Sequence, residues 1–207
     1  MKYLLIILIA YQGSLLAATT TLSGKVIKVY DGDTLTLQTD DGKEHSIRFE
    51  HIDAPEVNPK QDYGSESRDA LQALVLNKNV TVKVSGQDQY NRNLGVVYLG
   101  KGGGWKINKY GQWMRIPSLL KRQININLEM VARGHAWHYK DYSNEQQYLI
   151  AETRARMAKI GLWAANNPTA PWVFRQQNKQ QVSSSNNLNL NASIRMQLRA
   201  KQLLKHR

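Results

Sequence analysis

The sequence predicts an α+β fold, a small closed barrel of five β-strands with three α-helices packed against it. Short segments rich in β-branched residues, separated by turn signals, recur before residue 100. One helical pattern interrupts them after the third strand, and helical patterns dominate residues 127–160. Five strands with a helix inserted after the third favour a closed barrel over a sandwich.

The expected strands are bounded by recognisable turns. They comprise two runs within residues 22–37, then 45–49, 80–84 and 94–99. Asp31-Gly32 separates the first two runs as a turn or bulge signal. Asp40-Asp41-Gly42-Lys43, with Asp-Gly at its centre, predicts a hairpin turn before the third strand. Residues 88–92 turn the corner between the last two strands.

Three helices are expected from capping residues and apolar spacing. Ser65 reads as the N-cap of the first, in which Leu71, Leu74 and Val75 follow helical spacing. The other two are expected from Asn127 to Val131, ended by Gly134, and from Ser143 to Ile160, ended by Gly161.

Residues 1–18 have the layout of a secretory signal peptide. A basic start, Met1-Lys2, precedes an apolar run that is too short to span a bilayer comfortably, and small residues follow at Ala17-Ala18. We expect export to the periplasm or the medium, with an uncleaved membrane anchor as the alternative. The chain has no cysteine, so it contains no disulfide and no lipoprotein anchor.

The chain is strongly basic, with a formal net charge of +12 and a pI near 9.9. Such a charge favours a polyanionic partner, nucleic acid first and an anionic membrane surface second. Much of it lies beyond the expected domain at 22–172. Residues 173–207 are expected to form a disordered linker, rich in Gln, Asn and Ser at 176–191, and a basic tail. The tail would give weak contact with anionic membranes and strengthen non-specific binding to nucleic acid.

Residues 101–122 form a separate basic and aromatic segment. They carry six Lys or Arg and no acidic residue, with Trp105, Tyr110 and Trp113 interleaved. Two interpretations remain open. The segment extends a nucleic-acid groove through backbone contacts and base stacking, or it is an exposed loop that varies freely.

The chemistry is concentrated in acidic and arginine residues within strand-like segments. Asp31-Gly32-Asp33-Thr34 precedes a segment from Arg48 to Glu56 that also contains Asp53, and Arg92 follows in a third segment. Carboxylate oxygens suit a hard cation. Arginine suits a phosphate, because its planar fork binds two oxygens and stays protonated. Together they indicate metal-dependent cleavage of phosphodiesters.

These motifs resemble the staphylococcal nuclease (thermonuclease) family. They are Asp31-Gly32-Asp33-Thr34, then Arg48-x4-Asp53-x-Pro55-Glu56, then Asp88-x-Tyr90-x-Arg92, followed by Asn127-Leu128-x-x-Val131-x-x-Gly134. The resemblance covers residues 22–165, apart from 101–122. It implies an OB-fold barrel with three helices and one bound Ca²⁺. It also implies hydrolysis of DNA and RNA with little sequence specificity, leaving 3′-phosphates, by a protein that we expect to be a monomer.

The resemblance also implies a role for each site residue. Asp33 and Asp53 would be Ca²⁺ ligands together with the backbone carbonyl of Ala54, Glu56 would orient or deprotonate the attacking water, Arg48 and Arg92 would bind the phosphate, and Asp31 would support the ligands. Tyr139 is a candidate for base stacking, with core packing as the alternative, and Trp105 and Trp113 are further candidates for substrate contact.

Two other functions were weighed against this one. A nuclease-like barrel that binds nucleic acid without cutting it is the main alternative, but such relatives lose acidic and arginine positions that this chain retains. A membrane-surface or cell-wall adhesin would account for the charge and the signal, and would leave the acidic cluster unexplained.

Overall fold

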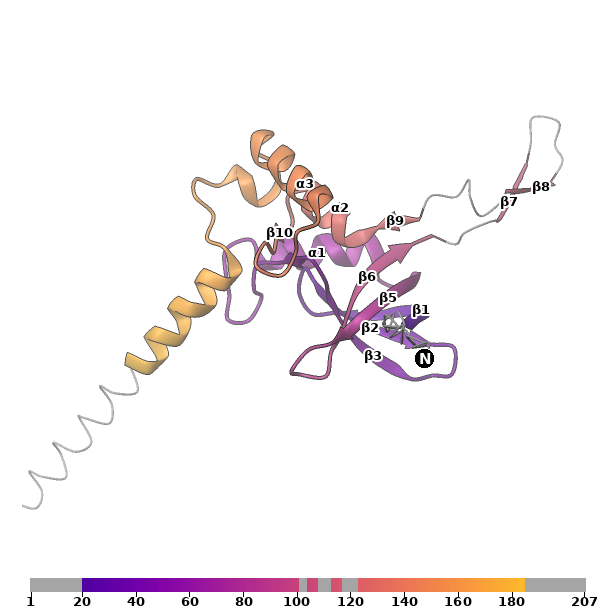
Figure 1. The fold of residues 1–207 in the computed structure, drawn as a ribbon, viewed down its shortest axis with the longest axis horizontal. Coiled ribbons are helices and arrows are strands. Elements are labelled where there is room, and N and C mark those ends of the chain that lie inside the picture. The colour runs from indigo at the N-terminus through magenta and orange to yellow at the C-terminus, as the bar shows by residue number, and fades with distance from the viewer. Residues whose placement is uncertain (1–19, 101–103, 108–112, 117–122, 185–207) are drawn as a thin grey trace, which may run out of the picture.

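The computed structural model describes residues 20–100, 104–107, 113–116 and 123–184 (Figure 1). The expected signal peptide at 1–18 therefore lies outside the described residues, as does the end of the basic tail. For 104–107 and 113–116 only the backbone is described. Within the described ranges, no helix is both long and apolar enough to cross a bilayer.

Five strands close into a barrel, which confirms the predicted fold class. They follow the order β3-β2-β1-β5-β6, and a parallel pairing of β3 with β6 joins the two ends. Their bounds are β1 Thr20–Val29, β2 Thr34–Thr39, β3 Glu44–Phe49, β5 Asn79–Gln87 and β6 Asn93–Leu99. Closure leaves neither β3 nor β6 as a free edge.

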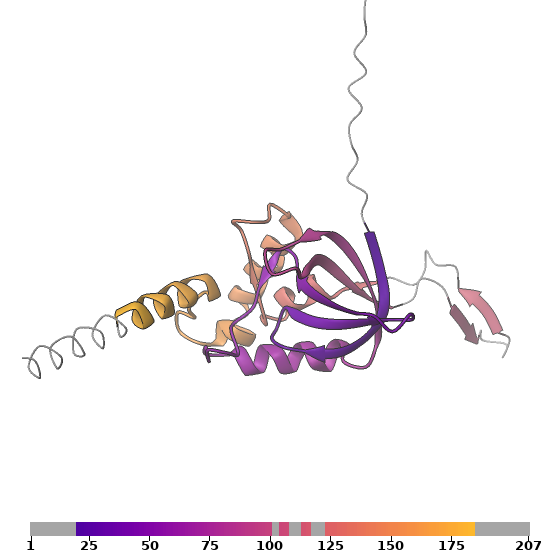
Figure 2. The ribbon, with the colours of Figure 1, turned by 90° about the horizontal axis from the view of Figure 1, so that it is seen from below.

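Helices pack against this barrel, and α1 runs along one side of it (Figure 2). The helices are α1 Gly64–Val75, α2 Ile126–Ala132, α3 Gln146–Met157 and the 3₁₀ helix η2 Gly161–Ala164. A further helix, here called the C-terminal helix, spans residues 171–184. Two short strands, β4 Ile52–Asp53 and β10 Trp137–His138, pair with each other beside the barrel.

Two apolar clusters hold the parts together. The larger one fills the barrel and the space under α1 and α2, with Leu35, Ile47, Phe49 and Leu71 almost fully buried. The smaller cluster joins α3 and η2 to the chain that leads into the C-terminal helix; it comprises Trp137, Ala155, Leu162, Trp163 and Ala170, with Tyr63 and Trp172 packed against it. The second cluster therefore anchors the start of the C-terminal helix to the domain.

The segment 101–122 contains a two-stranded hairpin. Strands β7 Gly104–Ile107 and β8 Trp113–Ile116 pair antiparallel with each other, in a sheet separate from the barrel (Figure 1). Strand β9 Ile124–Asn125 then returns to pair with the end of β6. The side chains of Trp105 and Trp113 lie outside the described part, so both interpretations of this segment stay open.

The three N-caps expected from the sequence, Ser65, Asn127 and Ser143, are all wrong. Helix α1 begins at Gly64 rather than after Ser65. Its first residue lies so close to the Glu56 carbonyl that a Cβ there would be 2.0 Å from the oxygen, so the position requires glycine. Helix α2 is capped by Asn125, whose side chain accepts from the Leu128 N–H. Asn127 is fully buried within that helix and bonds to the barrel instead.

Helix α3 is shorter than expected. It starts at Gln146 after Glu145, and Ser143 accepts from the Glu145 N–H without capping the helix directly. It ends at Met157 rather than at Ile160. Tyr148, Ala151 and Ala155 face the core as the spacing predicts.

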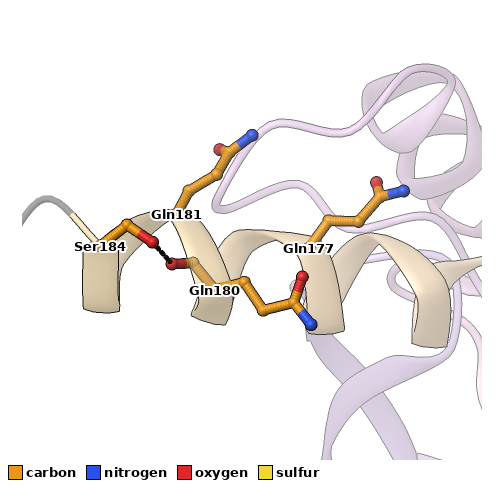
Figure 3. Close-up of a pocket in the computed structure, with 4 residues that line it drawn as sticks. All are labelled: Gln177, Gln180, Gln181 and Ser184. Atoms are coloured by element: carbon orange, nitrogen blue, oxygen red, sulfur yellow. Dashed lines mark hydrogen bonds between the residues drawn. The ribbon is translucent and has the colours of Figure 1, made fainter.

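The predicted disorder from Gln176 is wrong as far as residue 184, because the C-terminal helix includes these residues. Pro171 stands at its first position, where the missing N–H costs nothing. Gln177, Gln180 and Gln181 lie along its exposed length (Figure 3), and the Ser184 hydroxyl donates to the Gln180 carbonyl at 2.9 Å. The ordered fold thus continues past the expected boundary at 172.

Candidate active site: an acidic cluster held by arginines

Three neighbouring strands place the acidic and basic groups together. Asp33 ends the turn before β2, Arg48 lies near the end of β3, and Asp53 lies on β4. The β2–β3 register pairs Thr34 with Arg48, and the Phe49 N–H donates to the Asp33 carbonyl at 2.8 Å. Barrel pairing therefore fixes Asp33 relative to Arg48, and β4, which pairs with β10 outside the barrel, carries Asp53.

Arg48 lies between the two buried aspartates. Its Nη1 is 2.6 Å from Asp33 Oδ2, and its Nη2 is 2.7 Å from Asp53 Oδ1. Nη1 also lies within hydrogen-bonding distance of the Phe49 and Ile52 carbonyls. The side chain is 14% exposed. Arg48 thus compensates two charges that burial would otherwise make costly, and its expected role in phosphate binding stays a prediction.

The Asp33 carboxylate is oriented by its neighbours. Its Oδ2 accepts from the Ala54 N–H at 2.6 Å and its Oδ1 from the Thr34 hydroxyl at 3.1 Å. Asp31 Oδ1 accepts from the Asp33 N–H at 2.9 Å, which fits the predicted supporting role. Burial raises the pKa of Asp33 to about 7, against the opposing charge of Arg48. The side chains expected as metal ligands are therefore brought together with Ala54.

Glu56 lies at the rim of the cluster, with its side chain 23% exposed. Its backbone is held by Gln61, whose Oε1 accepts from the Glu56 N–H at 3.0 Å and whose N–H donates to the Glu56 carbonyl. The Gln61 amide also donates to the Thr169 carbonyl at 2.7 Å. The same buried glutamine thus connects the Glu56 loop to the chain that enters the C-terminal helix.

Arg175, on the C-terminal helix, joins the cluster, and sequence reasoning missed it. Its Nη2 is 2.7 Å from Asp53 Oδ2, and its Nη1 is 2.7 Å from Glu56 Oε1 and 3.2 Å from Asp53 Oδ1. Arg175 falls within residues 173–207, for which the sequence predicts a disordered linker and a basic tail. The signal that could have found it is the segment 171–174, where a proline and three apolar residues precede the arginine.

Tyr139 lies beside this cluster and is covered by aromatic rings. It follows β10, and its N–H donates to the His51 carbonyl. Its ring stacks on Trp172 of the C-terminal helix, with centroids 5.4 Å apart and planes at 11°, and lies 4.6 Å from the ring of Tyr142. Base stacking by Tyr139 stays a prediction, and its packing against Trp172 is observed.

Arg92 forms its hydrogen bonds with Asp88 and not with Asp33 or Asp53. Its guanidinium bonds to Asp88 in the turn between β5 and β6, with Nε 2.7 Å from Asp88 Oδ2. It also lies over the ring of Tyr90, which is 71% exposed rather than packed in the core. The side chain of Arg92 is 30% exposed and so remains available to a ligand.

The protein supplies only some of the oxygen ligands that a hard cation needs. Within the described ranges, no three acidic or histidine side chains converge closely enough to hold a metal ion alone. The buried oxygens of Asp33 and Asp53, with the Ala54 carbonyl, are the ligand type that Ca²⁺ takes, and it also accepts waters and phosphate oxygens. The type of these donors therefore fits Ca²⁺. In this structure Asp53 and Glu56 pair with the guanidinium of Arg175.

Comparisons with known proteins agree with this geometry. The sequence model described as "Staphylococcal nuclease homologue" matches residues 46–165. An "Uncharacterized endonuclease" of Haemophilus influenzae is 41% identical over 155 residues, covering 75% of this chain and 74% of that protein. One of the same name from Escherichia coli O157:H7 is 35% identical over 174 residues, covering 84% and 97%. A "Micrococcal nuclease" of Shigella flexneri is 32% identical over 158 residues, covering 75% and 82%. This chain belongs to the staphylococcal nuclease family.

Proposed function

We propose that this protein is an exported, Ca²⁺-dependent endonuclease that hydrolyses phosphodiester bonds in DNA and RNA with little sequence specificity and leaves 3′-phosphates. The observation that supports this best is the joining of Asp33 and Asp53 through Arg48 in one buried cluster, with Glu56 at its rim. Family membership supports a nucleic-acid substrate.

Asp33, Asp53 and the Ala54 carbonyl would hold the cation. When bound, the cation supplies positive charge that neutralises the phosphate oxygens. Glu56 accepts a proton from the attacking water or orients it, since its carboxylate is partly exposed next to the buried aspartates. Arg92, partly exposed, binds the phosphate and stabilises the charge that develops on it. Arg48 opposes the protonation that burial favours in the two aspartates, and it holds them in position.

The direct test is to incubate the purified protein with plasmid DNA and with RNA, in Ca²⁺ or in a chelator. We expect cutting of both substrates in Ca²⁺ and none in the chelator. Glu56→Gln should lose most of the activity while binding nucleic acid like the parent. Removal of terminal phosphate from the products by a phosphatase, followed by end mapping, checks the 3′-phosphate.

Two results would argue for other functions. Salt-dependent binding without Ca²⁺-dependent cutting would favour a non-catalytic binding module. Retention of the protein in the membrane fraction of cells, resistant to salt washing, would favour an uncleaved anchor over release to the periplasm or medium.

A further inference from the structure

The C-terminal helix reaches the site from outside the matched family region. The family match ends at residue 165, and the helix begins at 171. Figure 1 shows that the helix starts against the domain and runs away from it. Its first turn carries both Trp172 and Arg175, which contact Tyr139 and the acidic cluster respectively. An element beyond the family's common part thus contacts the two places where a nuclease of this kind would bind its ligands.

Arg175 occupies the carboxylate oxygens of Asp53 that a cation would need. Both oxygens of Asp53 accept from Arg175, at 3.2 and 2.7 Å, and Oδ1 also accepts from Arg48. The same guanidinium also donates a hydrogen bond to Glu56 Oε1. A cation coordinated by Asp53 would sit 2.3–2.6 Å from a carboxylate oxygen, next to a fixed positive charge. Docking of Arg175 and binding of a cation at Asp53 therefore oppose each other.

Trp172 similarly covers Tyr139. The Trp172 ring lies nearly parallel to that of Tyr139, with centroids 5.4 Å apart, so it covers a face of the tyrosine that base stacking would need. A base that stacks on this face of Tyr139 must displace the indole. One turn of helix thus presents a guanidinium to the carboxylates and a flat ring to the tyrosine.

The contacts that hold the docked helix lie at its start and in the chain just before it. Gln61 bonds to Thr169, just before the helix, and Trp172 packs edge-on against Trp137 at 5.5 Å. Beyond Arg175 nearly every described residue of the helix is exposed. An element with few buried contacts opens at low free-energy cost, so a cation or a nucleic acid can displace it.

We propose that the C-terminal helix is a built-in competitor of metal and nucleotide, in which Arg175 occupies the cation's carboxylates and Trp172 covers the base-stacking face of Tyr139. The inference rests on the proposed function, because it concerns the control of that same site. Each ligand displaces the part of the helix that competes with it: a cation displaces Arg175 from the carboxylates, and a base displaces Trp172 from Tyr139.

The first test measures Ca²⁺ affinity by calorimetry on the full purified protein. Arg175→Gln should bind Ca²⁺ about tenfold more tightly, since affinity is reduced by the fraction of molecules whose site is blocked. Lys179→Gln is the matched control: it removes the same charge one turn further along the helix, where the side chain contacts neither carboxylate, and should bind like the parent. Arg175→Lys keeps the charge but lacks the fork, and should lie between the two.

The outcomes separate the two proposals. Equal Ca²⁺ affinity in the parent and in Arg175→Gln overturns the competition and leaves the nuclease proposal standing. Absence of Ca²⁺ binding in every variant, Arg175→Gln included, refutes the proposed function and the competition with it. An equal gain in Lys179→Gln would mean that net charge alone sets the affinity, which also overturns the competition.

The second test follows the helix itself by amide hydrogen exchange. Adding Ca²⁺ to the parent should speed exchange in residues 171–184. Adding a single-stranded oligothymidine in chelator should also speed it, because a base that stacks on Tyr139 displaces Trp172. In Arg175→Gln exchange should already be fast without either ligand. Unchanged protection in the parent after Ca²⁺ has bound, or after the oligonucleotide has bound, overturns the corresponding half of the proposal.

Discussion

Arg48 Nη1 lies 2.6 Å from Asp33 Oδ2, in a contact made where β3 runs beside the start of β2. The same guanidinium also holds Asp53. Its removal would leave the buried Asp33 carboxylate without this cation and would leave Asp53 paired with Arg175. We expect Arg48→Met to lower the free energy of unfolding in chelator by about 3–5 kcal/mol, measured by urea denaturation. Arg68→Met removes an exposed arginine that pairs with Asp69 and should cost less than about 1 kcal/mol. A loss below 1 kcal/mol for Arg48→Met would mean that the aspartates do not depend on this contact.

Arg92 is expected to act on the reaction rather than on the fold. Its pair with Asp88 is partly exposed and so contributes little to stability. Arginines that act on phosphoryl-transfer transition states contribute about 10³–10⁵ in rate, and we expect a fall of that order in kcat/KM for Arg92→Ala, with Arg68→Ala as the control. Activity within tenfold of the parent would remove Arg92 from catalysis.

Asn127 and Asn125, two residues apart, should differ sharply in their effect on stability. Asn127 accepts from the Val97 N–H at 3.0 Å and donates to the carbonyls of Glu50 and Gly95 at 2.9 and 3.1 Å. Asn127→Ala leaves buried backbone groups unpaired and should cost about 3 kcal/mol. Asn125→Ala removes only a helix cap and should cost about 1 kcal/mol. Equal losses in denaturant titrations would contradict this ranking.

His135 makes stability depend on pH. Burial, with a smaller effect from Arg133, lowers its pKa below the ordinary value of 6.5. The unfolded chain therefore takes up a proton more readily than the native one, so this contribution is complete above about pH 6.5 and is lost as the pH falls through the lowered native pKa. We expect His135→Gln to lose less unfolding free energy than the parent between pH 7.5 and 5. A steeper loss in the variant would show that the sign is wrong.

Much of the barrel could be predicted because its signals are local. Alternating β-branched residues and the Asp41-Gly42 turn mark the first strands, and the spacing of Leu71, Leu74 and Val75 marks α1. The predicted helix boundaries were wrong where tertiary contacts determine the ends of the helix. Asparagine is a common N-cap residue, but the Asn127 side chain hydrogen-bonds to Val97 and Glu50 instead.

The cluster of Asp33, Arg48, Asp53 and Glu56 could be predicted because three of the residues lie within the short segment 48–56, and Asp33 immediately precedes the strand that pairs with β3. Arg175 could not be placed, since its role depends on where a distant helix docks, and a segment rich in Gln and Ser predicts no packing. Trp172, together with the buried Ala170 just before the helix, seats its start on the aromatic cluster around Trp137. The base-stacking and phosphate-binding roles remain predictions.

The pairing of β9 with the end of β6 brings the two ends of the segment 101–122 side by side. Tyr98 pairs with Asn125 and Leu99 with Ile124, and the Gln123 amide lies 3.5 Å from the Gly100 carbonyl. A connection whose ends already meet in a ladder tolerates changes in length at little entropic cost. This position is therefore a natural attachment point on the barrel. A fluorescent reporter or an affinity domain could be grafted there without altering the catalytic strands.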